Sequence, residues 1–187
     1  HAFLHCKCLL LTQSGHASSA GDWYTACRAR GACEAAETIA MVTLRDSFHK
    51  AIEQYHQAQK EFVRGNPQPL KAQCSHADDV TIIGGWGGIE KGWSAQVEKR
   101  YDWASARFAT DDDERRVENI STVVTPEMAY TVDIERTKIR LSGTQEVRPM
   151  ALRVTSIFRQ EDGQWKLVHR HADPLVEVQP AASIVRK

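Results

Sequence analysis

The sequence predicts an α+β domain in which a curved, mostly antiparallel sheet wraps around a long helix near the start of the domain. Three observations indicate this class. An amphipathic helical pattern begins near residue 44, strand-like segments fill the chain from residue 116 onward, and a tight Asp-Gly turn joins the last two of them. Helices followed by an antiparallel meander are typical of α+β folds, whose helices pack on one face of the sheet.

The long helix is indicated by apolar residues at the spacing of one helical face. These residues are separated by three, four or seven positions: Leu44, Phe48, Ile52, Tyr55 and Phe62. The run Gly65-Asn66-Pro67 should end the helix, since glycine caps a helix and proline prevents its continuation.

Shorter elements are expected between this helix and the strands. The pattern predicts a short helix over residues 69–75, a strand over 80–83, a glycine-rich loop over 84–88 and a helical stripe over 93–108.

Four strands are predicted after residue 115, over residues 116–124, 128–141, 149–159 and 165–172. The second strand alternates between two sets, one of Tyr130, Val132, Ile134 and Arg136, the other of Thr131, Asp133 and Glu135. The pattern leaves open which set faces outward.

The last strand has the most informative pattern. Asp162-Gly163 supplies a hairpin turn. If no bulge intervenes, alternation then places five residues on one face: Trp165, Leu167, His169, His171 and Asp173. A face that begins apolar and ends with two imidazoles and a carboxylate is unusual for a core strand, so we expect a pocket there.

The composition argues against a nucleic-acid or membrane partner. Twenty-four basic residues match 24 acidic ones, so the formal net charge is zero, and no field attracts polyanions or anionic lipids. No apolar run approaches the length of a membrane span. Five cysteines, four of them before residue 40, are not a disulfide framework for the main domain. We therefore expect a reducing, cytoplasmic location.

The first 40 residues differ from the rest of the chain. They contain four of the five cysteines and no sustained periodicity. A simple interpretation is that Met41 is the native start and that residues 1–40 are a poorly ordered or non-native extension. A pocket domain would then occupy residues 41–178, and a C-terminal tail residues 179–187.

Two motifs carry a family resemblance. His76-Ala-Asp-Asp-Val-Thr81 and Asp162-Gly-Gln-Trp-Lys-Leu-Val-His-Arg-His-Ala-Asp173, together with the order of elements, resemble the SnoaL-like branch of the nuclear transport factor two-like superfamily over residues 44–176. The ending also resembles the association domain of calcium/calmodulin-dependent kinase II. The superfamily includes ketosteroid isomerase, polyketide cyclases, epoxide hydrolases and many binding domains.

The resemblance implies a cystatin-like cone with a deep pocket between the concave face of the sheet and the helices. It also implies a homodimer built by packing sheets together. It fixes no reaction, because this fold carries many. The position that matches the catalytic aspartate of ketosteroid isomerase is Gly84, and glycine cannot transfer a proton.

The candidate catalytic residues are His169, His171 and Asp173. Imidazole titrates near neutral pH, so the histidines could act as general base and general acid while Asp173 orients one ring. Alternatively, one histidine lines a wet pocket and the other bonds to a neighbouring strand. A metal held by the His-x-His pair with His76 or Asp133 is a weaker alternative, because the spacing indicates no further ligands. We expect neither a metal nor a cofactor.

Two arginines are candidate ligand-binding residues. Arg136 and Arg153 are expected to point from neighbouring strands toward the concave face, where a guanidinium would bind a carboxylate through paired N–H donors. The alternative is an ion pair with Asp133, Glu135 or Asp173.

Aromatic residues near the glycine-rich loop are the remaining candidates. Trp86, Trp93 and Tyr101 could form apolar pocket walls for a planar or hydrophobic ligand, although Tyr101 could equally be core packing. Trp86 is flanked by four glycines, so we interpret it as a gate residue.

Two functions fit these patterns. The first is a small-molecule pocket protein that acts by general acid–base chemistry as an isomerase, cyclase or lyase on a hydrophobic or carboxylate-bearing ligand. The alternative is a noncatalytic ligand-binding or dimerisation module of the kinase-association type. A structural subunit that works through its outer sheet face is a third interpretation.

Overall fold

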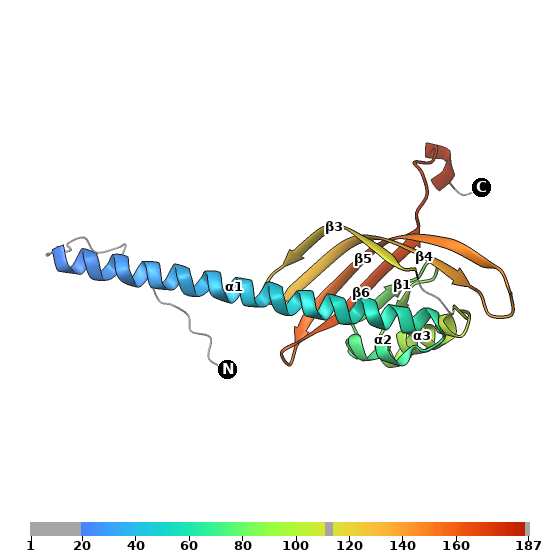
Figure 1. Cartoon of the computed structure of the whole chain (residues 1–187), viewed down its shortest axis with the longest axis horizontal. Coiled ribbons are helices and arrows are strands. Elements are labelled where there is room, and N and C mark those ends of the chain that lie inside the picture. The colour runs from blue at the N-terminus through green and yellow to red at the C-terminus, as the bar shows by residue number, and fades with distance from the viewer. Residues whose placement is uncertain (1–19, 111–113, 186–187) are drawn as a thin grey trace. The chain divides into compact units, whose positions relative to one another are not determined.

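The computed structural model describes residues 20–110 and 114–185. The chain divides into two compact units, His1–Asp46 and Ser47–Lys187. Helix α1 (Ala20–Val63) contributes residues to both units, and the other described helices and strands belong to the second (Figure 1).

Helix α1 begins much earlier than the periodicity predicts. The pattern indicated a start near Leu44, whereas α1 is helical from Ala20. The described side chains over residues 34–40 are all exposed. A helix with no face to bury needs no apolar stripe, and this stretch is rich in alanine, the strongest helix former. Residues 20–40 of the predicted poorly ordered extension are therefore helical, and residues 1–19 lie outside the described residues.

In the second unit, aromatic side chains join the end of α1 to the sheet. The ring of Phe48 lies 5.4 Å from that of Phe158 and 5.1 Å from that of Trp165, and the Tyr55 ring lies 5.4 Å from that of Phe158. These edge-to-face contacts stabilise the packing beyond area burial alone. Phe48 and Tyr55 of the predicted helical stripe therefore pack on the sheet, and Phe62 of the same stripe packs against Tyr101 and Phe108. The Gly65 cap is confirmed by its positive φ of 94°.

Short elements occupy the chain between α1 and the long strands. They are α2 (Gln68–Gln73), β1 (Thr81–Ile83), β2 (Glu90–Lys91), the π-helix η2 (Trp93–Val97) and α3 (Glu98–Ser105). The predicted helical stripe over 93–108 thus starts as a π-helix and ends at Ser105. Strand β2 was not predicted, because two residues are too few to show alternation.

Four long strands follow, as the sequence predicts, and each bound lies within two residues of its predicted position. They are β3 (Arg116–Val124), β4 (Met128–Arg140), β5 (Val147–Glu161) and β6 (Gln164–Pro174), followed by the short 3-10 helix η3 (Ala181–Ile184). The sheet order is β2-β1-β6-β5-β4-β3. Only the β1–β6 pairing is parallel. The predicted α+β class is confirmed.

The inner face of the sheet, which we define as the face toward α1, is polar along β4. Thr131, Asp133, Glu135 and Thr137 are buried on this face, whereas Tyr130 is exposed on the other. The alternation of β4 was therefore predicted correctly. The sequence left open which set faces outward, and the structure shows that Thr131, Asp133 and Glu135 face inward. Buried polar side chains must find partners, so this strand carries polar interactions into the interior.

A β-bulge at Val168 decides which residues of β6 point inward. Ile157 pairs with His169 but Phe158 pairs with Leu167, so Val168 is an extra residue in β6. An extra residue reverses the alternation of side chains beyond it.

The bulge overturns the predicted face of the last strand. Trp165 and Leu167 are buried before it, and Arg170 and Ala172 are buried after it. His169, His171 and Asp173 consequently occupy the outer face, so the expectation that they continue the face of Trp165 and Leu167 is wrong.

Candidate functional site

A cavity of about 660 Å³ lies within the second unit, between the inner face of the sheet and the helices. Five apolar walls come from five different elements: Phe62 of α1, Leu70 of α2, Ile82 of β1, Tyr101 of α3 and Leu152 of β5. This volume falls within the range of small-molecule sites, about 300–1,000 Å³.

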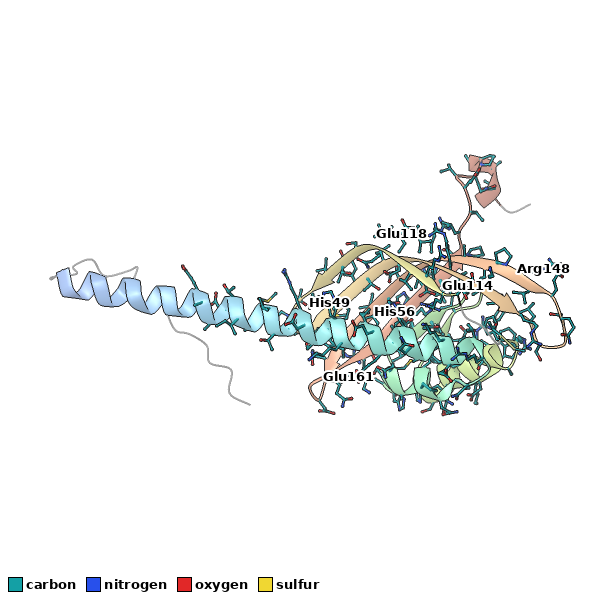
Figure 2. The ribbon with its side chains drawn as sticks, viewed as in Figure 1. His49, His56, Glu114, Glu118, Arg148 and Glu161 are labelled. Carbon is teal, nitrogen blue, oxygen red and sulfur yellow. The ribbon has the colours of Figure 1, made fainter. Side chains whose placement is uncertain are left out.

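The cavity runs from an exposed end to a buried end. At the exposed end, Trp86 is 48% exposed and Arg148 is highly exposed. Figure 2 shows Arg148 near the loop that joins β4 to β5. At the buried end, the side chains of Arg115, Glu135 and Arg170 are 4%, 5% and 9% exposed. A ligand that fills the cavity would therefore reach the buried charged groups of Arg115, Glu135 and Arg170 last.

Arg170, Glu135 and Arg115 form an ion cluster at the buried end. Nη1 and Nη2 of Arg170 donate to Oε1 and Oε2 of Glu135 at 3.0 and 2.8 Å, and Nη1 also donates to the hydroxyl of Tyr55 at 2.9 Å. Nη2 of Arg115 lies 2.8 Å from Oε1 of Glu135. Gln59 donates Nε2 to the same Tyr55 hydroxyl at 2.8 Å. Glu135 is thus shared by two guanidiniums.

The cluster fixes the protonation of Glu135. Burial would raise the pKa of this carboxyl, but the guanidiniums of Arg170 and Arg115 outweigh burial and lower the pKa to about 2. Burial raises the pKa of Tyr101 well above its ordinary value. Glu135 is therefore a permanent anion near neutral pH, and Tyr101 stays protonated, so neither is suited to proton transfer.

Arg115 has unused hydrogen-bonding capacity. Its Nε and Nη2 are buried and have no hydrogen-bond partner among the described residues. The contact of Nη2 with Glu135 is an ion pair by distance but lacks hydrogen-bond geometry. Buried donors without acceptors are costly, and an anionic oxygen in the cavity would satisfy them. Arg170, in contrast, has both terminal nitrogens bonded.

The predicted catalytic residues lie away from this cavity. His169 is half-buried and its Nδ1 lies 2.7 Å from Oγ1 of Thr81, in the neighbouring strand. His171 is exposed, and Asp173 accepts hydrogen bonds from Arg153. None of the three lines the cavity. A catalytic role for them stays a prediction that this geometry does not favour.

The predicted arginine pair also faces the wrong way. Arg136 is exposed and pairs with Glu118 at 2.7 Å, and Arg153 is exposed and pairs with Asp173 at 2.9 Å. Both belong to the outer set of their strands, since Ile134 pairs with Arg153 in the β4–β5 ladder. The expectation that they project into the concave face is wrong, because alternation in β4 and β5 puts them on the face opposite Glu135. Arg115 and Arg170 line the cavity instead.

Of the three predicted aromatic residues, the cavity includes two. Trp86 and Tyr101 line it, whereas Trp93 is buried and stacks on His76 with ring centroids 4.1 Å apart. Trp86 stacks on Phe108 at 5.0 Å and meets the edge of Trp103 at 5.6 Å. Trp86 lines the cavity and is partly exposed, which agrees with the predicted position at the mouth.

Glycines widen the cavity next to Trp86. A Cβ on Gly84 would lie 3.1 Å from Nη2 of Arg100, and one on Gly85 would lie 3.2 Å from the Leu152 side chain. Both glycines line the cavity. The position that the resemblance matches to a catalytic aspartate is therefore part of the cavity wall, without a side chain.

The sequence interpretation missed the three ionised residues at the buried end, and two signals could have found Arg170 and Glu135. Leu167 and Val168 are adjacent apolar residues, which interrupt strict alternation and indicate a bulge. Glu135 belongs to a set of polar residues that alternates along its strand from Thr131 to Thr137, which indicates a polar face. Arg115 carries no such signal, because it lies just before β3.

Neither a metal cluster nor a membrane helix is found in the described part of the chain. No group of three or more histidine, cysteine, aspartate or glutamate side chains there could hold a metal ion. No helix there combines the length and the apolar character needed to cross a bilayer.

Comparison with solved structures places the chain among proteins of the same fold. A proposed dehydratase of the nuclear transport factor 2-like family from Streptomyces avermitilis is 18% identical, with a TM-score of 0.59 over 74% of this chain and 99% of that one. A ketosteroid isomerase-like protein from Erwinia carotovora atroseptica is 16% identical, with a TM-score of 0.58 over 71% and 96%.

A proposed calcium/calmodulin-dependent protein kinase type II association domain from Thiobacillus denitrificans is also similar. It is 18% identical, with a TM-score of 0.51 over 67% of this chain and 93% of that one. At these identities the likeness establishes the fold alone, and matching structures share the predicted cystatin-like fold.

The family follows from the sequence itself. No curated protein matches the chain. The family model of the SnoaL-like domain, however, matches residues 48–177. This match covers most of the chain and coincides with the unit that contains the cavity. The chain therefore belongs to the SnoaL-like domain family.

Proposed function

We propose that this protein is a small-molecule binding module whose cavity takes an apolar ligand with an acidic group at one end. The observation that carries the proposal is the buried guanidinium of Arg115 at the inner end of the cavity, where Nε and Nη2 lack a hydrogen-bond acceptor among the described residues. A carboxylate there would accept both donors through the paired geometry that guanidinium favours.

Binding is favoured over acid–base catalysis because of the groups that line the cavity. Its titratable lining residues include no histidine. Glu135 is held ionised and the pKa of Tyr101 is raised, so neither exchanges protons readily near neutral pH. The half-buried His56 has a pKa lowered by burial and by Arg115, but it does not line the cavity.

Arg115→Met tests the proposal directly. We expect the variant to lose at least tenfold in affinity for 2-naphthylacetate, measured by isothermal titration calorimetry, since a charge-assisted hydrogen bond contributes about 1.5–3 kcal/mol. Arg153→Met is the matched control, because Arg153 lies exposed on the outer face and pairs with Asp173. Equal affinities in both variants and the unmodified protein, or no binding at all, would contradict the proposal.

We also propose that the protein forms a homodimer through the outer face of the sheet. Tyr130, Val132 and Ile134 alternate onto this face, and Ile157 pairs directly with Tyr130. An apolar patch on a sheet face favours packing against a second copy. Sedimentation should show a dimer that Ile134→Glu converts to a folded monomer. A monomeric unmodified protein would rule the dimer out.

A reducing, cytoplasmic location remains part of the proposal. It rests on the cysteine pattern of the sequence. Cys74, the free cysteine of the second unit, is buried with a pKa raised by burial to about 12 and is unreactive in either redox environment. Such a thiol behaves as a small hydrophobic side chain.

A further inference from the structure

The buried end of the cavity carries an uneven number of charges. Two guanidiniums, Arg115 and Arg170, and one carboxylate, Glu135, line it. All three side chains are at least nine-tenths buried. Among the described residues, the groups that line this end therefore carry one net positive charge, in surroundings that water screens poorly.

Other charged side chains among the described residues lie outside the lining of the buried end. Asp133 is buried on the same strand; its Oδ1 accepts a hydrogen bond from the neutral amide of Asn119 at 2.7 Å, and it does not line the cavity. Arg100 lines the wall near Trp86, where its Nε lies 3.6 Å from Glu90. Arg148, at the mouth, pairs with Glu146 at 2.7 Å.

The two arginines play different parts. Both oxygens of Glu135 accept hydrogen bonds from Arg170, so this pair is neutral as a unit. The remaining charge of the lining is that of Arg115, whose Nε and Nη2 have no hydrogen-bond acceptor in the part of the chain that the structure describes. One singly charged acid would restore neutrality, whereas a doubly charged acid would leave a buried negative charge.

We propose that Glu135 determines which ligand charge the site accepts, so that the cavity selects acids with one negative charge over acids with two. The inference rests on the proposed function, because it assigns the class of acid that the same site binds. Glu135 contacts both arginines and offsets one of their two positive charges. It would thereby determine the ligand charge for which the site is specific.

Three naphthalene probes of similar size test the selection in the unmodified protein. They are 2-naphthylacetate with one charge, 2-naphthylmethylphosphonate with one or two charges depending on pH, and the neutral 2-naphthylacetamide. Calorimetry on either side of the second phosphonate ionisation should show at least a tenfold loss of phosphonate affinity when the second proton leaves. The acetate affinity, which reports any titration of the protein itself, should change much less across the same pH range.

Glu135→Gln tests the role of the residue itself. The variant raises the net charge of the cluster to two positive charges, so the ratio of doubly charged phosphonate affinity to acetate affinity should rise at least tenfold. An unchanged ratio in a folded variant would overturn the assignment to Glu135. If the variant does not fold, the comparison of probes in the unmodified protein still decides whether the site selects by charge.

The outcomes separate this inference from the proposed function. If the acetate binds, depends on Arg115 and exceeds the neutral amide, but the doubly charged phosphonate binds equally well or better, only the charge selection fails. If the amide binds as well as the acetate, or if Arg115→Met changes nothing, the acidic-ligand proposal fails as well.

Discussion

The two faces of the sheet contain the same kind of ion pair in opposite surroundings. On the inner face, Arg170 donates two hydrogen bonds to Glu135 at 2.8 and 3.0 Å, and both side chains are nearly inaccessible. On the outer face, Arg153 donates two to Asp173 at 2.9 and 3.2 Å, and both are about half exposed. Because the geometry is alike, the difference in burial should decide how much each pair contributes to the free energy of unfolding.

The largest contrast should come from removing one carboxylate of each pair. Glu135→Gln leaves two buried guanidiniums without their anion, which should cost about 3–5 kcal/mol of unfolding free energy. Asp173→Asn removes an exposed pair and should cost less than about 1 kcal/mol. Urea denaturation of both variants measures the contrast. Equal losses would mean that burial does not distinguish the two pairs.

The inner pair should also make stability depend on acid. The pKa of Glu135 falls from 4.5 to about 2 on folding, so the unfolded chain binds more protons in this range. The stabilisation is complete above about pH 4.5 and is lost as the pH falls toward 2, with a total on the order of 3 kcal/mol.

Urea denaturation over this pH range should show the slope, and Glu135→Gln should remove this part of it. His56, whose folded pKa is also lowered, should add a loss that begins near pH 6.5 and persists in the variant. A Glu135→Gln curve parallel to that of the unmodified protein would assign the acid sensitivity to other groups.

The smallest effect should come from the two histidines of the outer face. Alanine at His169 or His171 should change the affinity for 2-naphthylacetate by less than about twofold, because neither side chain lines the cavity. The same calorimetric titration checks it. A tenfold loss of affinity in either variant would indicate that the imidazole contacts the ligand.

Most of the fold could be predicted from the sequence, because its signals are local. The stripe of Phe48, Tyr55 and Phe62 gave the packed face of α1, and the strand bounds followed from alternation and turn residues. The start of α1 could not be predicted, since residues 20–40 show no sustained apolar periodicity from which a helical face could be recognised. The family resemblance added the existence of a pocket.

The site was predicted less well, because it depends on register. An arginine clamp was the expected chemistry, and the structure places arginines in the cavity, but Arg136 and Arg153 were the wrong choice. A single extra residue exchanges the faces of a strand, and Arg115 reaches the cavity from outside any strand. Trp86 and Tyr101 were placed correctly because loop and helix positions are insensitive to that shift.

Val168, the extra residue of the bulge, determines which side chains of β6 face the cavity. Loss of one codon there would restore simple alternation, turning the imidazoles of His169 and His171 toward the hollow and the guanidinium of Arg170 away from it. A chain with the same His-Arg-His triplet but without this extra residue would be expected to present the opposite set of side chains to the hollow. Transfer of site assignments between such chains requires the strand pairing as well as the matched letters.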